Sequence, residues 1–95
     1  MNTVIYVDVD DTLIRSVGPR RIPNPHLLNR LPALIRTATA AYLWSAGGAD
    51  YAREVATELG IDHLFTGFLP KPTLYIDDQP AANWPNCRHV LPTNL

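Results

Sequence analysis

Three carboxylates and a hydroxyl lie close together near the start of the chain. Asp8, Asp10, Asp11 and Thr12 directly follow the apolar residues 4–7, whose β-branched and aromatic side chains predict a buried strand. Carboxylates packed this closely repel one another unless a cation, a raised pKa or solvent relieves the repulsion. The pattern suits either a cation site that contains a nucleophile or a solvated, aspartate-rich turn. Two aspartates separated by one residue, taken alone, favour the solvated turn.

Further polar residues follow the other strands that the sequence predicts. One strand is expected over residues 38–45 and another over residues 73–76, and each ends in polar side chains. Because ligands bind at the carboxyl ends of parallel strands, we expect these side chains to converge on one pocket. The set that would meet there comprises Asp8, Asp10, Ser45, Lys71, Asp77 and Asp78.

Two helices are expected between the strands. Asn24 can cap the first and Pro25 suits its first turn, while Pro32 should kink this helix or divide it into two shorter pieces. The second helix is expected over residues 49–59 and ends at Gly60. These helices would connect the strands and bury an apolar face against them.

Two short strands complete the predicted set, around residues 64–66 and 88–91, and residues 79–84 should form a turn or one short helix. Alternating strands and helices predict an α/β domain with a parallel sheet. The spatial strand order should be 5-4-1-2-3, because the acids that follow the first and fourth strands must be neighbours. We therefore expect one α/β domain over residues 1–95, with helices flanking the sheet.

The segment between the first strand and the first helix carries several arginines. Residues 13–25 contain glycine and proline, so a loop with a short hairpin is expected. The loop is either a solvated basic surface or a flap that offers an arginine to a substrate anion. The arginines are Arg15, Arg20 and Arg21.

In order and spacing, the polar motifs resemble those of the haloacid dehalogenase superfamily of phosphohydrolases. The resemblance covers residues 4–78, which is most of the chain. Asp8 and Asp10 match the first motif, Ser45 the second, Lys71 the third, and Asp77 with Asp78 the fourth. The fold implied is the Rossmann-like core of that superfamily. No insertion between the motifs is long enough for a cap domain, so the chain resembles a minimal, capless member.

The resemblance implies a phosphatase that works through a phosphoaspartate. Asp8 would attack phosphorus, and Asp10 would protonate the leaving oxygen and later deprotonate the attacking water. Ser45 would donate a hydrogen bond to a phosphoryl oxygen, and Lys71 would offset negative charge in the transition state.

The resemblance also implies a magnesium ion, which suits an oxygen-only ligand set. Its ligands would be the carboxylates of Asp8 and Asp77, the backbone carbonyl of Asp10 and, directly or not, Asp78. Asn83 is the only further candidate after the fourth motif.

The sequence leaves the substrate and the type of reaction open. An open site suits a phosphoprotein, a nucleic acid end or a small phosphorylated metabolite. One alternative is a binding or regulatory module that keeps the site as a metal and phosphate receptor. Another is a phosphotransferase with an acceptor other than water.

Composition and charge limit the class of protein, its partners and its location in the cell. The 95 residues are 46% hydrophobic and 18% charged, which is typical of a single globular domain. The net charge of −1 gives no general attraction to nucleic acids or anionic membranes, so a nucleic acid is expected only as a substrate end. The single cysteine, Cys87, excludes an internal disulfide. Neither a membrane span nor a secretory leader is apparent, so we expect a cytoplasmic protein. The sequence does not indicate an oligomeric state.

Overall fold

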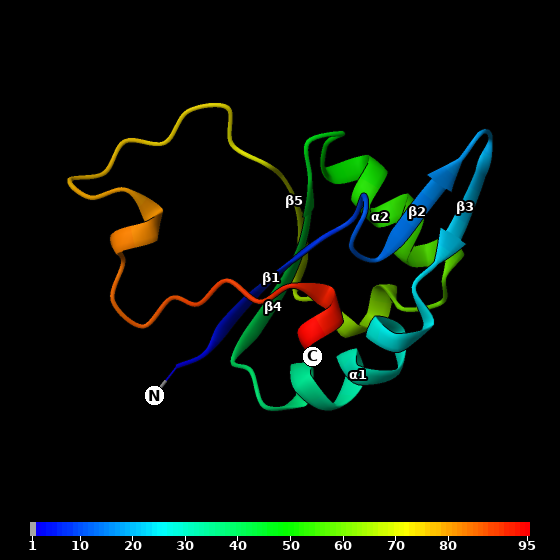
Figure 1. Cartoon of the computed structure of the whole chain (residues 1–95), viewed down its shortest axis with the longest axis horizontal. Coiled ribbons are helices and arrows are strands. Elements are labelled where there is room, and N and C mark those ends of the chain that lie inside the picture. The colour runs from blue at the N-terminus through cyan, green and yellow to red at the C-terminus, as the bar shows by residue number, and fades with distance from the viewer. Residues whose placement is uncertain (1) are drawn as a thin grey trace.

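Three parallel strands form the sheet around which the chain is arranged. The computed structural model describes residues 2–95, in which β1 (Val4–Asp8), β4 (Ala40–Ser45) and β5 (Gly67–Pro70) lie side by side in that order (Figure 1). α1 (Pro25–Arg36) connects β1 to β4, and α2 (Ala49–Glu58) connects β4 to β5. The predicted α/β class is confirmed, and these three strands keep the relative order expected for the first three.

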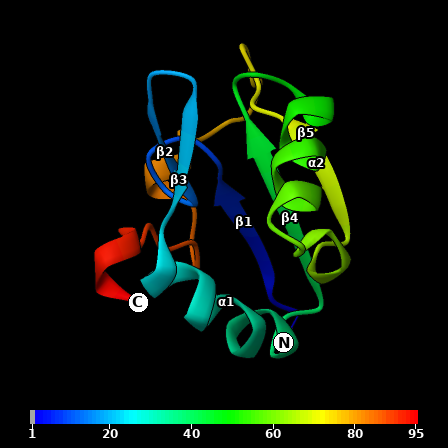
Figure 2. The ribbon, with the colours of Figure 1, turned by 90° about the vertical axis from the view of Figure 1, so that its right-hand side faces the viewer.

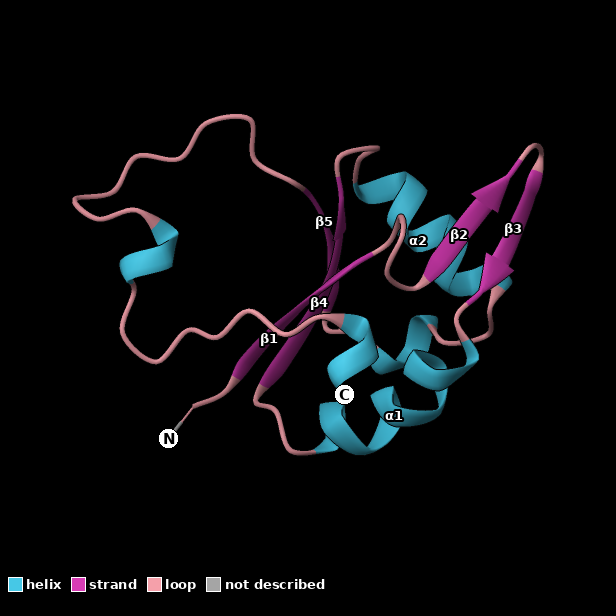
Figure 3. Ribbon diagram, viewed as in Figure 1, coloured by secondary structure: helices cyan, strands magenta, loops and turns pink. Residues whose placement is uncertain are grey.

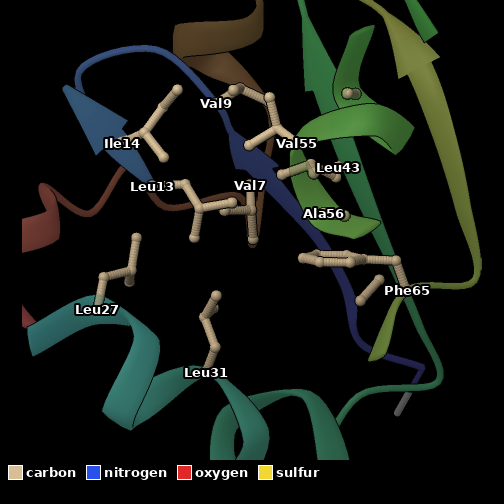
Figure 4. Packing of buried hydrophobic residues seen from close by; sticks show 12 residues of the cluster. Val7, Val9, Leu13, Ile14, Leu27, Leu31, Leu43, Val55, Ala56 and Phe65 are labelled. Carbon is tan, nitrogen blue, oxygen red and sulfur yellow. The ribbon is translucent and has the colours of Figure 1, made fainter. Parts of the chain in front are cut away.

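The two helices cover the same face of the sheet. Figure 2 shows α1 and α2 in front of the strands, with much of the chain after β5 behind them. Val7 and Leu43 point toward the helices and pack in a core with Leu31 of α1 and Val55 of α2 (Figure 4). The strands alternate between buried and partly exposed residues, so the apolar side chains of one sheet face make the core.

Local signals account for α1. The Asn24 side chain accepts a hydrogen bond from the N–H of Leu27 at 3.3 Å, and Pro25 occupies the first turn. The Thr37 hydroxyl donates to the carbonyl of Leu34 at 2.7 Å at the other end. Pro32 lies inside the helix, which continues through it to Arg36, so the predicted division into two pieces does not occur.

The arginine-rich loop forms the expected hairpin. β2 (Ile14–Val17) pairs antiparallel with β3 (Arg20–Pro23), as Figure 3 shows. The guanidinium of Arg21 bonds to the carboxylate of Glu58 on α2 at 2.6 Å. That bond is the main reason why the pKa of Arg21 is raised. The hairpin is therefore anchored on α2 by one of the three arginines that were candidates for binding a substrate anion.

The strand predictions after α2 are corrected by the structure. Residues 62–64 form a short 3-10 helix, and the third strand of the sheet is residues 67–70, not 64–66. Neither 73–76 nor 88–91 forms a strand, and the positions beside the outer edge of β1 are not filled by other strands of the described chain.

Chain connectivity explains why residues 73–76 do not extend the sheet. β5 ends beside the end of β4, where Pro70 pairs with Ser45. Only Lys71 and Pro72 separate β5 from residue 73, whereas a connection between parallel strands needs about a dozen residues. With β5 in place, the chain cannot return to the start of the sheet and run parallel beside β1. It instead passes outward as a wide loop and returns to α1 (Figure 3).

The loop leaves apolar side chains uncovered. Leu74 is 76% exposed and Ile76 is 92% exposed. The chain rejoins the domain where the His26 ring donates a hydrogen bond to the carbonyl of Leu95 at 2.8 Å. The expected short helix in 79–84 is present as a 3-10 turn over Ala81–Asn83. Within residues 2–95, neither the α-helices nor the shorter turns have the length and apolar character needed to cross a membrane.

Candidate functional site

Asp8 is the centre of a small cluster at the carboxyl edge of the sheet. It ends β1, and its Oδ1 lies 2.8 Å from the Nζ of Lys71, which directly follows β5. The hydroxyl of Thr12 donates to Oδ2 of the same carboxylate at 2.9 Å. The side chains of Lys71 and Asp8 remain 39% and 27% exposed. The structure thus joins two predicted site residues, distant in sequence, in an ion pair that a ligand can approach.

A tight turn after β1 holds Thr12 in place. The N–H groups of Thr12, Leu13 and Ile14 all donate to the carbonyl of Val9. Val9 and Leu13 are fully buried, so they fix the base of the turn in the core. This arrangement directs the Thr12 hydroxyl back to Asp8.

Ser45 lies at the end of the neighbouring strand and is fully buried. Its Oγ accepts the N–H of Gly47 at 2.9 Å, and its carbonyl accepts the N–H of Lys71 at 2.9 Å. Because Oγ acts as an acceptor here, its own proton can be donated to a ligand oxygen. Ser45 therefore positions the backbone of Lys71, and its own hydroxyl lies buried at the sheet edge.

The turn after Ser45 requires a glycine. A Cβ at Gly47 would lie 2.9 Å from Cδ2 of Tyr51, which is closer than unstrained side-chain packing allows. The small residue lets the first turn of α2 approach the strand end. As a result, Tyr51 reaches the same edge of the sheet as the acidic turn.

Asp10 is held by Tyr51. The Tyr51 hydroxyl donates to Oδ1 of Asp10 at 2.7 Å. Burial, followed by this hydrogen bond, raises the pKa of Tyr51, so its hydroxyl stays protonated and able to donate. The Arg21 guanidinium lies 5.3 Å from the centre of the Tyr51 ring, on the side of the hairpin. The second aspartate of the acidic turn is thus oriented by α2 and the hairpin.

The sequence interpretation missed this role of Tyr51. The apolar spacing of the second helix includes Tyr51 among the residues of its buried side and gives no indication of a link to Asp10. A useful signal was its place in the first turn of a helix that starts just after Ser45. A side chain there lies at the carboxyl edge of a parallel sheet, where the other polar groups collect.

Asp77 and Asp78 do not join the cluster. They belong to the segment of residues 72–91, which extends away from the sheet (Figure 1). The Asp77 carboxylate accepts the N–H of Gln79 at 3.0 Å, and this bond is the main cause of its lowered pKa. Among the described residues, no group of three or more histidine, cysteine or acidic side chains is placed to hold a metal ion. The predicted meeting of all four aspartates is therefore not observed, because 73–76 does not pair with β1.

The remaining oxygen ligands are compatible with magnesium. Each oxygen of Asp8 makes one polar contact within the protein, to Lys71 or to Thr12, and a carboxylate offers about four lone-pair positions. Mg²⁺ usually keeps several waters and is bound by one or two carboxylates. Asp8, with the nearby backbone of the acidic turn, fits such a water-rich site.

The cluster opens into a large cleft beside the free edge of β1. The cleft has a volume of about 1460 Å³, and Asp8, Thr12, Trp44 and Lys71 line it. The other wall includes residues of the segment 72–91. A carboxylate with an adjacent fixed cation, accessible from a cleft of this size, can bind an anionic group and attack it.

Comparisons of the chain with protein-family models, curated proteins and solved structures found no match.

Proposed function

We propose that this protein is a Mg²⁺-dependent phosphomonoester hydrolase of the haloacid dehalogenase type, with Asp8 as its nucleophile. The observation that carries the proposal is the Asp8–Lys71 ion pair at the carboxyl edge of the sheet. The Thr12 hydroxyl donates to Asp8, and the backbone N–H of Lys71 donates to the carbonyl of Ser45. A carboxylate cannot easily approach a phosphate anion, so a fixed positive charge beside it has a clear chemical purpose.

In the first step, an Asp8 oxygen forms a bond to phosphorus as the ester oxygen departs with its electron pair. The departing oxygen takes a proton from Asp10, which becomes a carboxylate. Lys71 and the Ser45 hydroxyl stabilise the charge on the phosphoryl oxygens. When bound, Mg²⁺ would supply further neutralisation between the two anions.

In the second step, Asp10 removes a proton from water, and the water oxygen attacks phosphorus. The bond from phosphorus to Asp8 breaks, which releases inorganic phosphate and restores the Asp8 carboxylate. The Tyr51 hydroxyl occupies only one oxygen of Asp10, so the other oxygen can carry the proton. Asp10 is thus held in position for both transfers.

This proposal includes a rearranged state of the sheet, which has the complete strand order 5-4-1-2-3. Residues 73–76 would have to pair with the free edge of β1, and the end of β5 would have to separate from β4 to lengthen the connection. Asp8 and Asp10 are therefore the metal-binding residues of the core, and Asp77 and Asp78 become ligands only after that rearrangement. Asn83 lies in the same outer segment.

A binding or regulatory module is the second candidate. The position of Asp77 and Asp78 outside the cluster favours it, because a site with fewer metal ligands can bind phosphate without turning it over. Transfer to an acceptor other than water is a variation of the same chemistry, and the wide cleft would admit an acceptor. Adding alcohol acceptors to the assay separates transfer from hydrolysis.

Phosphate release should require magnesium. With p-nitrophenyl phosphate, the purified protein should hydrolyse the ester in Mg²⁺ and lose this activity in excess EDTA, because two anions must approach each other. Restoring Mg²⁺ should restore the rate. Full activity in EDTA contradicts the metal requirement, and phosphate binding without turnover in Mg²⁺ identifies the binding module.

Replacing Lys71 with methionine should lower kcat by about 10²–10³-fold, the usual effect of losing one electrostatic contact to a transition state. The fold should persist, because an ion pair as exposed as this one contributes only about 0–1 kcal/mol to stability. Steady-state kinetics and thermal unfolding measure the two effects.

Arg53→Met is the matched control for Lys71→Met. Arg53 pairs with Asp50 on the surface of α2, so its loss removes one positive charge without touching Asp8. This variant should keep the wild-type rate. Equal rates for the Lys71 variant and the wild type would show that Lys71 is only a surface residue.

A further inference from the structure

Three aromatic side chains lie together on the sheet face opposite the helices, and they extend along the strands from the position of Asp8. In the parallel register, Tyr6 pairs with Tyr42 and Asp8 pairs with Trp44. Side chains at alternate positions of a strand share one face, so Tyr6 and Asp8 lie on the same side of β1, next to their partners on β4. We call Tyr6, Tyr42 and Trp44 the aromatic platform.

The Tyr6 ring packs against both other rings. The ring centres of Tyr6 and Trp44 are 4.8 Å apart with an interplanar angle of 85°, and those of Tyr6 and Tyr42 are 5.4 Å apart. Edge-to-face packing of this kind restrains the rings. Tyr6 is nevertheless 48% exposed, so part of the platform is accessible to a ligand.

The platform is continuous with the anion-binding end of the cleft. The Nζ of Lys71 lies 5.8 Å from the ring centre of Trp44 and 2.8 Å from Asp8. Tyr6, Trp44 and Lys71 all line the same cleft. One ligand can therefore place a phosphate near Lys71 and a flat ring against the aromatic side chains.

We propose, resting on the phosphatase function proposed above, that the substrate is a nucleoside phosphate whose base stacks on the aromatic platform. The phosphate lies at Asp8 and Lys71, and the base lies over Tyr6. Two residues along a strand span about 7 Å, so a sugar fits between the phosphate and a base stacked on Tyr6. In an aryl phosphate the ring is bonded directly to the phosphate oxygen and would lie beside Asp8, short of Tyr6.

The nucleoside phosphate can be a free mononucleotide or the end of a single strand. The cleft, at about 1460 Å³, is larger than the roughly 300–1000 Å³ of most small-molecule sites. Arg88 and His89 also line it and can contact further phosphates of a strand. Stacking on aromatic side chains suits both ligands, because every base has a flat face.

The test compares leaving groups in three proteins: wild type, Tyr6→Leu and Tyr6→Phe. The substrates are the 5′- and 3′-monophosphates of adenosine, single-stranded oligonucleotides phosphorylated at either end, and glycerol phosphate. Loss of one stacking contact should raise KM for the better adenosine substrate about 5- to 100-fold in Tyr6→Leu, with little change for glycerol phosphate. Tyr6→Phe keeps the ring and should behave as the wild type.

This experiment distinguishes a free mononucleotide from a strand end as the substrate. It also distinguishes failure of the nucleotide proposal from failure of the phosphatase proposal. A larger effect of Tyr6→Leu on the oligonucleotides than on the mononucleotides identifies a strand end as the substrate, and the reverse identifies the free nucleotide. The proposal is overturned if the preference for adenosine phosphates over glycerol phosphate is absent in the wild type or unchanged in Tyr6→Leu. Hydrolysis of glycerol phosphate in either case shows that the phosphatase function stands without it.

A binding measurement tests whether nucleotides bind at the aromatic platform even if no ester is hydrolysed. In a Trp84→Phe background, Trp44 is the only tryptophan, and adenosine monophosphates added in EDTA should quench its fluorescence at saturating concentration. Tyr6→Leu should weaken this binding by a similar factor. No quenching by either adenosine monophosphate, or the same affinity in Tyr6→Leu, overturns nucleotide binding at this face.

Discussion

Replacing Asp8 with asparagine should abolish both phosphate release and the formation of a covalent phosphoryl adduct. The amide has nearly the shape of the carboxylate, but it is uncharged and does not attack phosphorus. It also leaves Lys71 without the carboxylate that it contacts at 2.8 Å. Mixing the protein with acetyl phosphate and recording the intact mass should reveal an adduct on an active protein and none on Asp8→Asn.

Asp11→Asn is the matched control for this experiment. Asp11 belongs to the same turn, and its φ of 62° lies in the left-handed region, which asparagine tolerates well. This variant removes one carboxylate from the turn without touching the proposed nucleophile, so it should still form the adduct. A phosphoryl adduct on Asp8→Asn would show that the nucleophile is another residue.

Replacing Asp10 with asparagine should reduce turnover by about 10²–10⁴-fold, the usual contribution of general acid–base catalysis. The geometry should survive, because the asparagine carbonyl can still accept the hydrogen bond from Tyr51 that Oδ1 of Asp10 accepts at 2.7 Å. Acetyl phosphate has a leaving group that needs little protonation, so it should still phosphorylate Asp8. The adduct should then persist, because no base activates water.

Tyr51→Phe separates the chemistry of Asp10 from its position. It removes the hydrogen bond but leaves the carboxylate, so turnover should fall far less than in Asp10→Asn. Time-resolved intact-mass measurements follow the decay of the adduct in both variants. An adduct on Asp10→Asn that decays as fast as in the wild type would exclude Asp10 as the base for the second step.

The sequence predicted the elements whose signals are local. The apolar run before Asp8 became β1, and the run before Ser45 became β4. Asn24 caps α1 as expected, and the expected hairpin is present between β1 and α1. These elements follow from side-chain periodicity and capping, which depend on residues close in sequence.

Tertiary structure decided which strands could pair. Residues 73–76 have an apolar strand pattern, yet they remain uncovered because Lys71 and Pro72 are too short a connection from β5 to the edge of β1. A strand also needs a partner to satisfy its backbone, and no periodicity reports whether the chain can reach one. The position of Asp77 was therefore not determined by its own sequence neighbourhood.

In the candidate site, too, the sequence alone determines some features and only the tertiary structure decides the others. The sequence alone predicted that Asp8 and Ser45 would lie at one sheet edge, because each ends a predicted strand. Lys71 precedes the predicted strand 73–76, and it reaches that edge only because β5 ends at Pro70. Only the tertiary structure paired Lys71 with Asp8, bound Asp10 to Tyr51, and left one sheet face open with its aromatic rings. Those contacts join residues up to 63 positions apart (71 minus 8), and the packing of strands and helices, not local propensity, sets which of them meet.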